Sequence, residues 1–295
     1  MIVLWGVALL STTVVGLVVF FDISLDEERA RNAGFRTRLL AESGLAVAMH
    51  PQVEPFDPVL RQDMGGGGSF TASIHSEGGR LNLNRLVVSE DRDLLLDLFA
   101  AWGLKLQESS ALIDALKDWV DADELRSLDG AERGNYEALG QFGMPRNAPF
   151  TSVEEARAVI GMDRLAELRP DWADFFSIWS AGPIDVNEAS AELLRIATGA
   201  TEREIELVVE RRLGEDGERG TEDDFEYDEL EQVRTMLGMG SEQFAVIAGR
   251  LSVDDPVRRI ESTGQIGAYR KKIVVLARKD DGALLSWQEP PLENP

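Results

Sequence analysis

The stretch MIVLWGVALLSTTVVGLVVFFD, residues 1–22, decides the architecture of this chain. Its first twenty-one residues carry no charged side chain, although the whole sequence of 295 residues has a formal net charge of −23. An α-helix rises about 1.5 Å per residue, so this run spans roughly 30 Å, the thickness of one hydrocarbon core. It is longer than the apolar part of a secretory signal, which has about 7–15 residues. We therefore expect residues 1–21 to form the transmembrane half of an N-terminal helix.

Residues 22–50 should continue the same helix outside the membrane. The segment contains no proline before Pro51 and is rich in Ala, Leu, Glu and Arg, which favour helices. Its apolar residues recur at helical spacings, so one apolar stripe must pack on the chain's own domain or on neighbouring copies. The surface predicted for membrane insertion and assembly consists of Leu4, Trp5, Leu9, Leu10, Val14, Leu17, Phe20 and Phe21.

Short runs of alternating apolar and polar residues predict strands at both ends of the remaining chain. After the glycines at 65–68, alternation over 70–74 and 81–84 predicts a hairpin. Near the C-terminus, glycine-bounded runs predict three strands, at 258–266, 269–278 and 283–289. We expect the first and last strands to meet in one small antiparallel sheet, formed by residues 51–88 and 252–295.

The sequence between the two strand regions, 89–251, indicates an inserted helical domain. Several short helices end at glycine, and Ser89 and Thr151 or Ser152 are candidate N-caps. Helix–glycine–helix patterns are typical of helix-hairpin-helix units of the sterile-alpha-motif (SAM) type, here two units at about 89–180 and 183–251. The predicted fold class is α+β: a long N-terminal helix packed on a small antiparallel sheet, with a large all-helical insertion.

Composition excludes several function classes. Aspartate and glutamate total 53 against 30 lysines and arginines, and such an acidic surface repels the phosphate backbone of nucleic acids. The chain has no cysteine, which excludes disulfides, zinc–thiolate sites and thiol nucleophiles. The ordinary apolar fraction excludes a polytopic membrane protein.

Distinctive motifs are spread over most of the chain. They are VLWGVALLS and LLAESGLAVAM in the N-terminal helix, GGRLNLNRL in the first strand region, ALIDALKDWVDAD, GAERGNYEALG and MPRNAPFTSVEEARAVIGM in the first helical unit, and IDVNEASAELLRIATG in the second. In their order and spacing these motifs resemble those of the type II secretion minor pseudopilin K family. The longest match runs in near-continuous register through the first part of the helical insertion.

This resemblance implies a pilin-like fold and a structural, non-enzymatic role. It implies a subunit at the tip of the periplasmic pseudopilus that forms a ternary complex with minor pseudopilins I and J, initiates the filament and supports export across the outer membrane. Further implied partners are the inner-membrane assembly platform and the secretin or cargo. The implied location is the inner membrane, crossed once, with most of the chain in the periplasm.

Two features of the N-terminal segment bear on that implication. Most pilins carry a glutamate near the start of the apolar helix, whereas no acidic residue precedes Asp22 here. This absence fits a subunit with none ahead of it, but it also fits an ordinary membrane anchor, which avoids charge. The family also has a short basic leader that is cut after a glycine, and the printed sequence shows none. Either the sequence begins a few residues late, or translation begins at Met1 without that processing.

An acidic loop, residues 214–231, is the candidate metal site. Its three glycines allow turns that fold oxygen ligands around a hard cation, and calcium takes six to eight oxygens. Calcium sites are also implied by the resemblance. The alternative is a solvated acidic loop without metal. The predicted calcium ligands are Asp216, Glu218, Asp223, Asp224 and Asp228.

No catalytic residues are predicted. Asp114, Asp118 and Asp121 are three and four residues apart and, with Asp123, are expected to form the hydrated face of a helix rather than an acid–base site. The two histidines, His50 and His75, fall in different elements, which gives no support to a shared metal or triad role.

Two other functions share some of these features. A minor pilin of a type IV pilus-like system would have the same N-terminal helix but would not need the helical insertion. A membrane-anchored helix-hairpin-helix protein could bind DNA, but the hairpin at 198–201 is followed by Glu202 and no lysine occurs again until Lys271.

Overall fold

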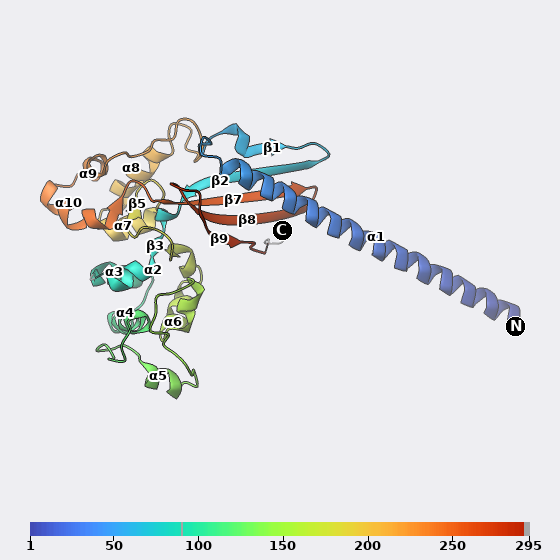
Figure 1. Cartoon of the computed structure of the whole chain (residues 1–295), viewed down its shortest axis with the longest axis horizontal. Coiled ribbons are helices and arrows are strands. Elements are labelled where there is room, and N and C mark those ends of the chain that lie inside the picture. The colour runs from blue at the N-terminus through green and yellow to red at the C-terminus, as the bar shows by residue number, and fades with distance from the viewer. Residues whose placement is uncertain (90, 292–295) are drawn as a thin grey trace. The chain divides into compact units, whose positions relative to one another are not determined.

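The computed structural model describes residues 1–89 and 91–291 (Figure 1). The chain forms two compact units, which we describe separately. Unit 1 contains Met1–Ile74, Ile260–Val275 and the residues from Ser286 on, and unit 2 contains His75–Arg259 and Leu276–Leu285. At this level the predicted α+β class is confirmed, with a long helix on a five-stranded antiparallel sheet and a separate helical region.

The long helix α1 of unit 1 runs without a break from Ile2 to Ala48, as the absence of proline predicted. Its C-terminal part lies along the sheet (Figure 1). There Ala41, Leu45 and Ala48 are buried, at 0%, 2% and 0% exposure. Small side chains at this contact let the helix backbone approach the strands closely.

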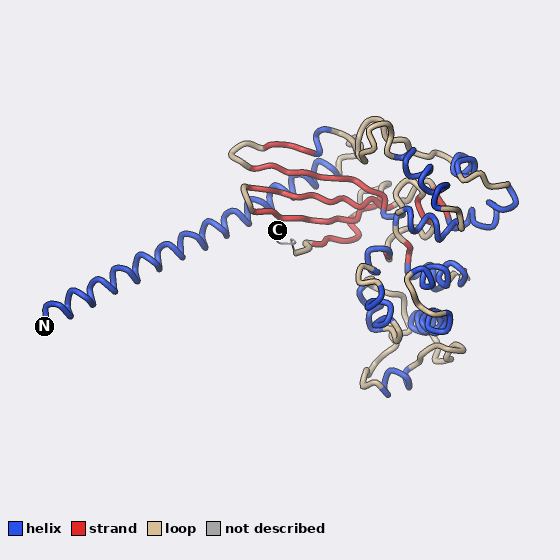
Figure 2. The backbone as a smooth tube through the Cα atoms, turned by 180° about the vertical axis from the view of Figure 1, so that it is seen from behind, coloured by secondary structure: helices blue, strands red, loops and turns tan. Residues whose placement is uncertain are grey.

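The main sheet brings the first and last strands together, as predicted (Figure 2). Its short edge strand β1 is antiparallel to β2, with Gln62 opposite Phe70. The strand order is β1 (Arg61–Asp63), β2 (Gly68–Ser76), β7 (Val257–Ile266), β8 (Tyr269–Arg278) and β9 (Leu284–Gln288). The last three strands correspond to the three predicted C-terminal strands.

Two glycines set the distance between α1 and the sheet. A Cβ atom on Gly264 of β7 would lie 2.0 Å from the carbonyl oxygen of Thr37 and 2.6 Å from the amide nitrogen of Ala41. A Cβ atom on Gly44 of α1 would lie 2.8 Å from the Phe70 ring. All three distances are shorter than a van der Waals contact, so a side chain at either position would push the helix off the sheet.

The predicted hairpin between 70–74 and 81–84 is wrong. Strand β3 is only Leu81–Asn82 and pairs in parallel with β4, Phe176–Ser177. The Asn82 side chain accepts a hydrogen bond from the backbone amide of Arg85 at 3.0 Å and so begins helix α2, Leu83–Val88. An N-cap interaction therefore overrides the alternating pattern.

Unit 2 is built from short helices around a core rich in aromatic rings. Trp119, Tyr136 and Trp172 are each 0% exposed, and Trp119 stacks on Phe150 with ring centroids 6.0 Å apart. A second parallel pair joins β5, Ile184–Asp185, to β6, Leu251–Ser252. Besides α2, the helices are α3 (Arg92–Ala101), α4 (Leu106–Val120), α5 (Arg133–Ala138), α6 (Met162–Leu168), α7 (Ala191–Thr198), α8 (Glu202–Arg212), α9 (Leu230–Met236) and α10 (Ser241–Ile247).

The helix–glycine–helix pattern of unit 2 is confirmed at Gly199, whereas two predicted helix starts differ from the structure. Gly199 ends α7 in the left-handed conformation, with φ 67°, and Thr201 caps α8, as the helix–glycine–helix pattern predicted. Ser89 follows α2, whereas Asp91 caps α3 by accepting the amide of Leu94. The Ser152 hydroxyl accepts the amide of Glu155 at 3.2 Å, but the element that follows is a 3₁₀ turn, Glu154–Ala158, and not an α-helix.

Candidate functional site

The predicted calcium loop is held by its own backbone. Asp223 Oδ2 accepts hydrogen bonds from the amides of Glu215, at 2.5 Å, and Asp216, at 3.1 Å. These amides and the Thr221 hydroxyl lower the pKa of Asp223, with the hydroxyl contributing most. The Asp223 carboxylate therefore has protein donors in place of a cation.

The other predicted calcium ligands are spread along the same loop. Asp224 Oδ2 accepts the Gly220 amide at 2.7 Å, and Asp216 Oδ1 accepts the Glu218 amide at 2.7 Å. Asp228 is exposed. A different group of three carboxylates, in which none of the five predicted residues takes part, has one oxygen from each member within 4.8 Å of the others. The calcium loop stays a prediction.

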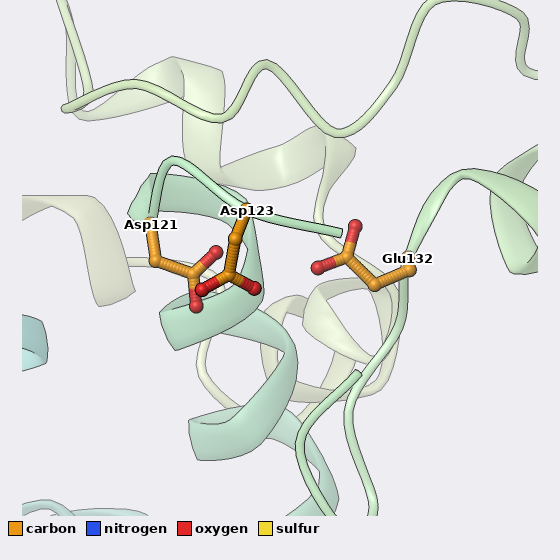
Figure 3. Close-up of side chains that lie close together, drawn as sticks. All are labelled: Asp121, Asp123 and Glu132. Atoms are coloured by element: carbon orange, nitrogen blue, oxygen red, sulfur yellow. The ribbon is translucent and has the colours of Figure 1, made fainter. Parts of the chain in front are cut away.

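That group consists of Asp121, Asp123 and Glu132 (Figure 3). Asp121 directly follows α4, and Glu132 directly precedes α5, so the cluster lies where one helix ends and the next begins. The close-up shows the Glu132 carboxylate facing the two aspartates. The three side chains are intermediate, exposed and buried, in that order, so solvent reaches the cluster from the Asp123 side.

Buried carboxylates of α4 fold the connecting segment back onto the helix. Both oxygens of Asp118 lie 3.1 Å from the amide of Ser127, and Asp114 Oδ2 accepts the amide of Asp129 at 3.1 Å. A Cβ atom on Gly130 would lie 2.0 Å from Asp118 Oδ2, so this position needs a glycine. These contacts bring Glu132 within reach of Asp121 and Asp123.

The predicted hydrated face of α4 is therefore wrong for two of its members. Asp118 is 0% exposed and Asp114 is 7% exposed. Asp114 is also paired with Arg92, whose guanidinium donates to Asp114 Oδ1 at 2.5 Å. The helical periodicity placed both aspartates opposite the apolar residues, but the backbone amides of the returning segment supply the donors that make their burial favourable.

The cluster itself has fewer such donors, although Asp123 Oδ1 accepts the amide of Leu125 at 2.7 Å. Glu132 is 7% exposed, and neither of its carboxylate oxygens has a hydrogen-bond partner in the described part of the chain, nor has Asp121 Oδ1. The Arg133 amide lies near the Glu132 carboxylate but without hydrogen-bond geometry. Burial raises the pKa of Glu132 to about 7, and the charges of Asp118 and Asp121 act in the same direction. Burial, with Asp123 next, also raises the pKa of Asp121.

The two histidines lie in different surroundings, as expected. His75 Nδ1 is 3.0 Å from Glu188 Oε1, a pairing that sequence reasoning missed because the two residues are far apart in the chain. His50 follows α1, and its Nδ1 accepts the Gln52 amide at 3.3 Å. Burial acts to raise the pKa of Glu188, but the hydrogen bond with His75 and the charge of Arg219 prevail and lower it.

The predicted membrane and assembly surface lies on α1. Six of its eight side chains are exposed by at least half, and the side chains of Leu4 and Phe21 lie outside the described residues. No helix in the described part of the chain combines the length and apolarity needed to cross a membrane. The six exposed side chains are Trp5, Leu9, Leu10, Val14, Leu17 and Phe20.

Known proteins resemble this chain in sequence and in fold. Residues 79–170 match the family described as Type II secretion system (T2SS), protein K. Type II secretion system protein K of Pseudomonas aeruginosa is 30% identical over 243 residues, which cover 76% of this chain and 68% of that protein. A chain in the crystal structure of the GspK–GspI–GspJ complex from the enterotoxigenic Escherichia coli type 2 secretion system matches with a TM-score of 0.63. That match has 15% identity, covers 92% of this chain and 99% of the other, and shows the similarity of the fold.

Proposed function

This chain belongs to the type II secretion system protein K family, and on that premise we propose that it is a structural minor pseudopilin at the tip of the pseudopilus. In this role it initiates the filament and supports protein export across the outer membrane. The observation that carries the proposal is the fold match, which extends over nearly the whole of both chains rather than over one domain. It acts as an assembly component and not as an enzyme.

The proposed partners are minor pseudopilins I and J. The matched chain was solved in a complex with GspI and GspJ. Because this chain has a similar fold, it has helices and strands that could contact partners of the same kind. We also propose contacts with the inner-membrane assembly platform and with the secretin or cargo, because the family resemblance implies them.

The α1 surface supports assembly by helix packing. Thr37 and Ala41 are buried against the sheet of unit 1, but Phe35 is 62% and Leu39 44% exposed on the same stretch of helix. Phe35 and Leu39 are four residues apart and therefore lie on one face. A helix that packs one stripe on its own sheet and leaves a second apolar stripe exposed is suited to contact a neighbouring pilin helix.

We further propose that residues 1–21 anchor the chain in the inner membrane, with the larger part in the periplasm. The exposed apolar side chains along the first half of α1 cost free energy in water, at about 25 cal/mol per Å² of apolar surface. Insertion into lipid removes that cost without any further protein contact.

We also propose that the short helices of unit 2 form an inserted helical domain of two SAM-like units, at about 89–180 and 183–251.

A minor pilin of a type IV pilus-like system is the second candidate for the α1 and sheet architecture. The helical unit 2 argues for the secretion role, because its first part carries the match to protein K, residues 79–170. DNA binding is disfavoured by the net charge of −23 and by the glutamate that follows the hairpin at 198–201.

Co-purification tests this proposal. The full chain with an affinity tag is co-expressed with the I and J pseudopilins of the same bacterium and extracted in detergent. We expect all three proteins to elute as one complex, and we expect Phe35→Asp to weaken it. Asn32→Asp, one turn earlier on the same exposed face, is the matched control and should leave the complex intact. Failure of the unaltered chain to retain either partner would refute the proposal.

A further inference from the structure

The two edges of the main sheet differ in how they are protected. The strand order places β1 at one edge and β9 at the other. Edge strands in native proteins are usually very short or carry charges or proline, because an unpaired edge is a template for a strand of another chain. Strand β1 has three residues, and two of them, Arg61 and Asp63, are charged. Strand β9 has five residues, LLSWQ, and contains neither a charged residue nor a proline.

Alternate backbone groups of β9 point away from the sheet. The turn between β8 and β9 is closed by the Arg278 amide, which donates to the Ala283 carbonyl at 3.0 Å. Because backbone groups alternate in direction along an antiparallel strand, every second residue after Ala283 points its amide and carbonyl outward. These residues are Leu284, Ser286 and Gln288. Within residues 1–89 and 91–291, no further strand continues the sheet beyond β9 (Figure 2).

Ion pairs hold the end of β9 next to α1. The carboxylate of Glu289, which directly follows β9, lies 2.9 Å from Lys271 of β8 and 2.9 Å from Arg38 of α1. Arg38 also pairs with Glu42 at 2.8 Å, and the Trp287 indole donates to Glu289 Oε1 at 3.2 Å. All of these residues belong to unit 1. The helix and the end of the edge strand therefore form one continuous surface.

We propose that the open edge of β9 pairs with an extended strand of a neighbouring minor pseudopilin. Arg38 is three residues after Phe35, so a partner packed on the exposed face of α1 lies next to the end of β9. Main-chain hydrogen bonds supply affinity in such strand addition, and side chains supply specificity. Leu284 and Trp287 are 54% and 45% exposed, so the complementary strand is uncharged and carries apolar side chains beside them. This inference rests on the proposed function, because its partner is a pseudopilin.

Hydrogen exchange of the assembled complex tests the inference. The full chain is purified in detergent, alone and with pseudopilins I and J, and exchange is followed by mass spectrometry. Peptides that cover 284–289 should exchange at least about tenfold more slowly in the complex, because the outward amides of β9 gain acceptors. The amides of β1, at the opposite edge, should exchange equally in both samples.

Ser286→Pro removes one outward amide at a position where an edge strand accepts proline. Recovery of the partners should fall at least about fivefold, the loss expected for one backbone hydrogen bond. Ser286→Thr keeps the amide and favours a strand, so this matched control should recover the partners as the unaltered chain does. Thermal unfolding checks that both variants fold, and the exchange measurement decides the question without any variant.

The outcomes separate this inference from the proposed function. A complex that forms without slower exchange in β9, or that Ser286→Pro forms as fully as the unaltered chain, would overturn the strand pairing and leave the proposed function standing. Slow exchange of β9 in the chain alone, together with a dimeric mass, would assign the edge to a second copy and also overturn the pairing. Failure to recover either partner would refute the proposed function and this pairing with it.

Discussion

The carboxylate of Asp118 holds the amide of Ser127, nine residues later in the chain, with both oxygens at 3.1 Å. Asp118 is completely buried, so this contact supplies part of the polar interaction that its charge requires. It also fixes the segment that carries Gly130 and Glu132. The geometry of the acidic cluster thus depends on a residue that is not a member of it.

Asp118→Ala should therefore destabilise unit 2. The substitution leaves the Ser127 amide without its acceptor and opens a small cavity, at a cost of about 1–3 kcal/mol in the free energy of unfolding. Thermal unfolding of the full chain measures the loss. Asp129→Ala, an exposed carboxylate in the same loop, should change the free energy of unfolding by less than about 0.5 kcal/mol. Equal effects of the two variants would contradict the assigned role of Asp118.

Two glycines of α1 give opposite predictions for the same substitution. Gly34→Ala meets no atom within 4 Å and should stabilise the helix by about 1 kcal/mol. Gly44→Ala places its Cβ 2.3 Å from Ser262 Oγ and 2.8 Å from the Phe70 ring. Overpacking of this kind costs about 1–3 kcal/mol. Denaturant unfolding of both variants measures the difference, and a stabilised Gly44→Ala would show that α1 does not pack on the sheet as described.

Glu155 should contribute to stability in a pH-dependent way. Burial acts to raise its pKa, but hydrogen bonds from Thr151, Arg146 and Trp119 prevail and lower it below the ordinary 4.5. A group with a lowered pKa in the folded state stabilises the fold above its unfolded pKa, and that contribution is lost as the pH falls through the folded pKa.

Glu155→Gln should accordingly be less stable than the unaltered chain at pH 7, by about 1 kcal/mol or more. The difference should shrink below about pH 4, where the carboxylate becomes protonated in the unaltered chain. Unfolding followed by fluorescence from pH 7 to pH 3 provides the measurement. A difference that is constant with pH would show that the charge of Glu155 does not contribute.

The proposed anchor can be tested at Val14, near the middle of the apolar segment. Val14 is 50% exposed on α1. An aspartate at the centre of a membrane helix costs about 3 kcal/mol, so Val14→Asp should shift the chain from the membrane pellet to the soluble fraction after carbonate extraction. Val14→Leu keeps the apolar character and should remain in the pellet. Retention of both variants in the pellet would argue against insertion of this segment.

Local signals predicted much of the fold. The absence of proline before Pro51 predicted the length of α1, and glycine-bounded alternation predicted β7, β8 and β9. The sequence could not predict that Asn82 caps a helix, because the alternation of Leu81 and Leu83 fits a strand and the start of a helix equally well. Local pattern identifies an element only when no tertiary contact or cap competes with it.

The cluster of Asp121, Asp123 and Glu132 could not be predicted from local sequence, for a different cause. The spacing of Asp114 and Asp118 placed them on a polar helix face, but their burial depends on backbone amides that arrive from residues 127–129. Gly130 marks a turn in the sequence, but no spacing signal indicates that Glu132 returns to the aspartates, because like charges repel one another. The density of carboxylates instead favoured the loop at 214–231, whose carboxylates accept hydrogen bonds from the loop's own backbone.

Cross-linking from α1 tests the central claim, assembly with pseudopilins I and J, most directly. The chain has no cysteine, so Phe35→Cys introduces a unique attachment point for a photoreactive maleimide on the exposed face of the helix. In membranes containing all three proteins, irradiation should link this position to pseudopilin I or J, and the buried control Ala41→Cys should give no such product. If Phe35→Cys is labelled but yields no adduct with either partner, the assembly proposed here is wrong.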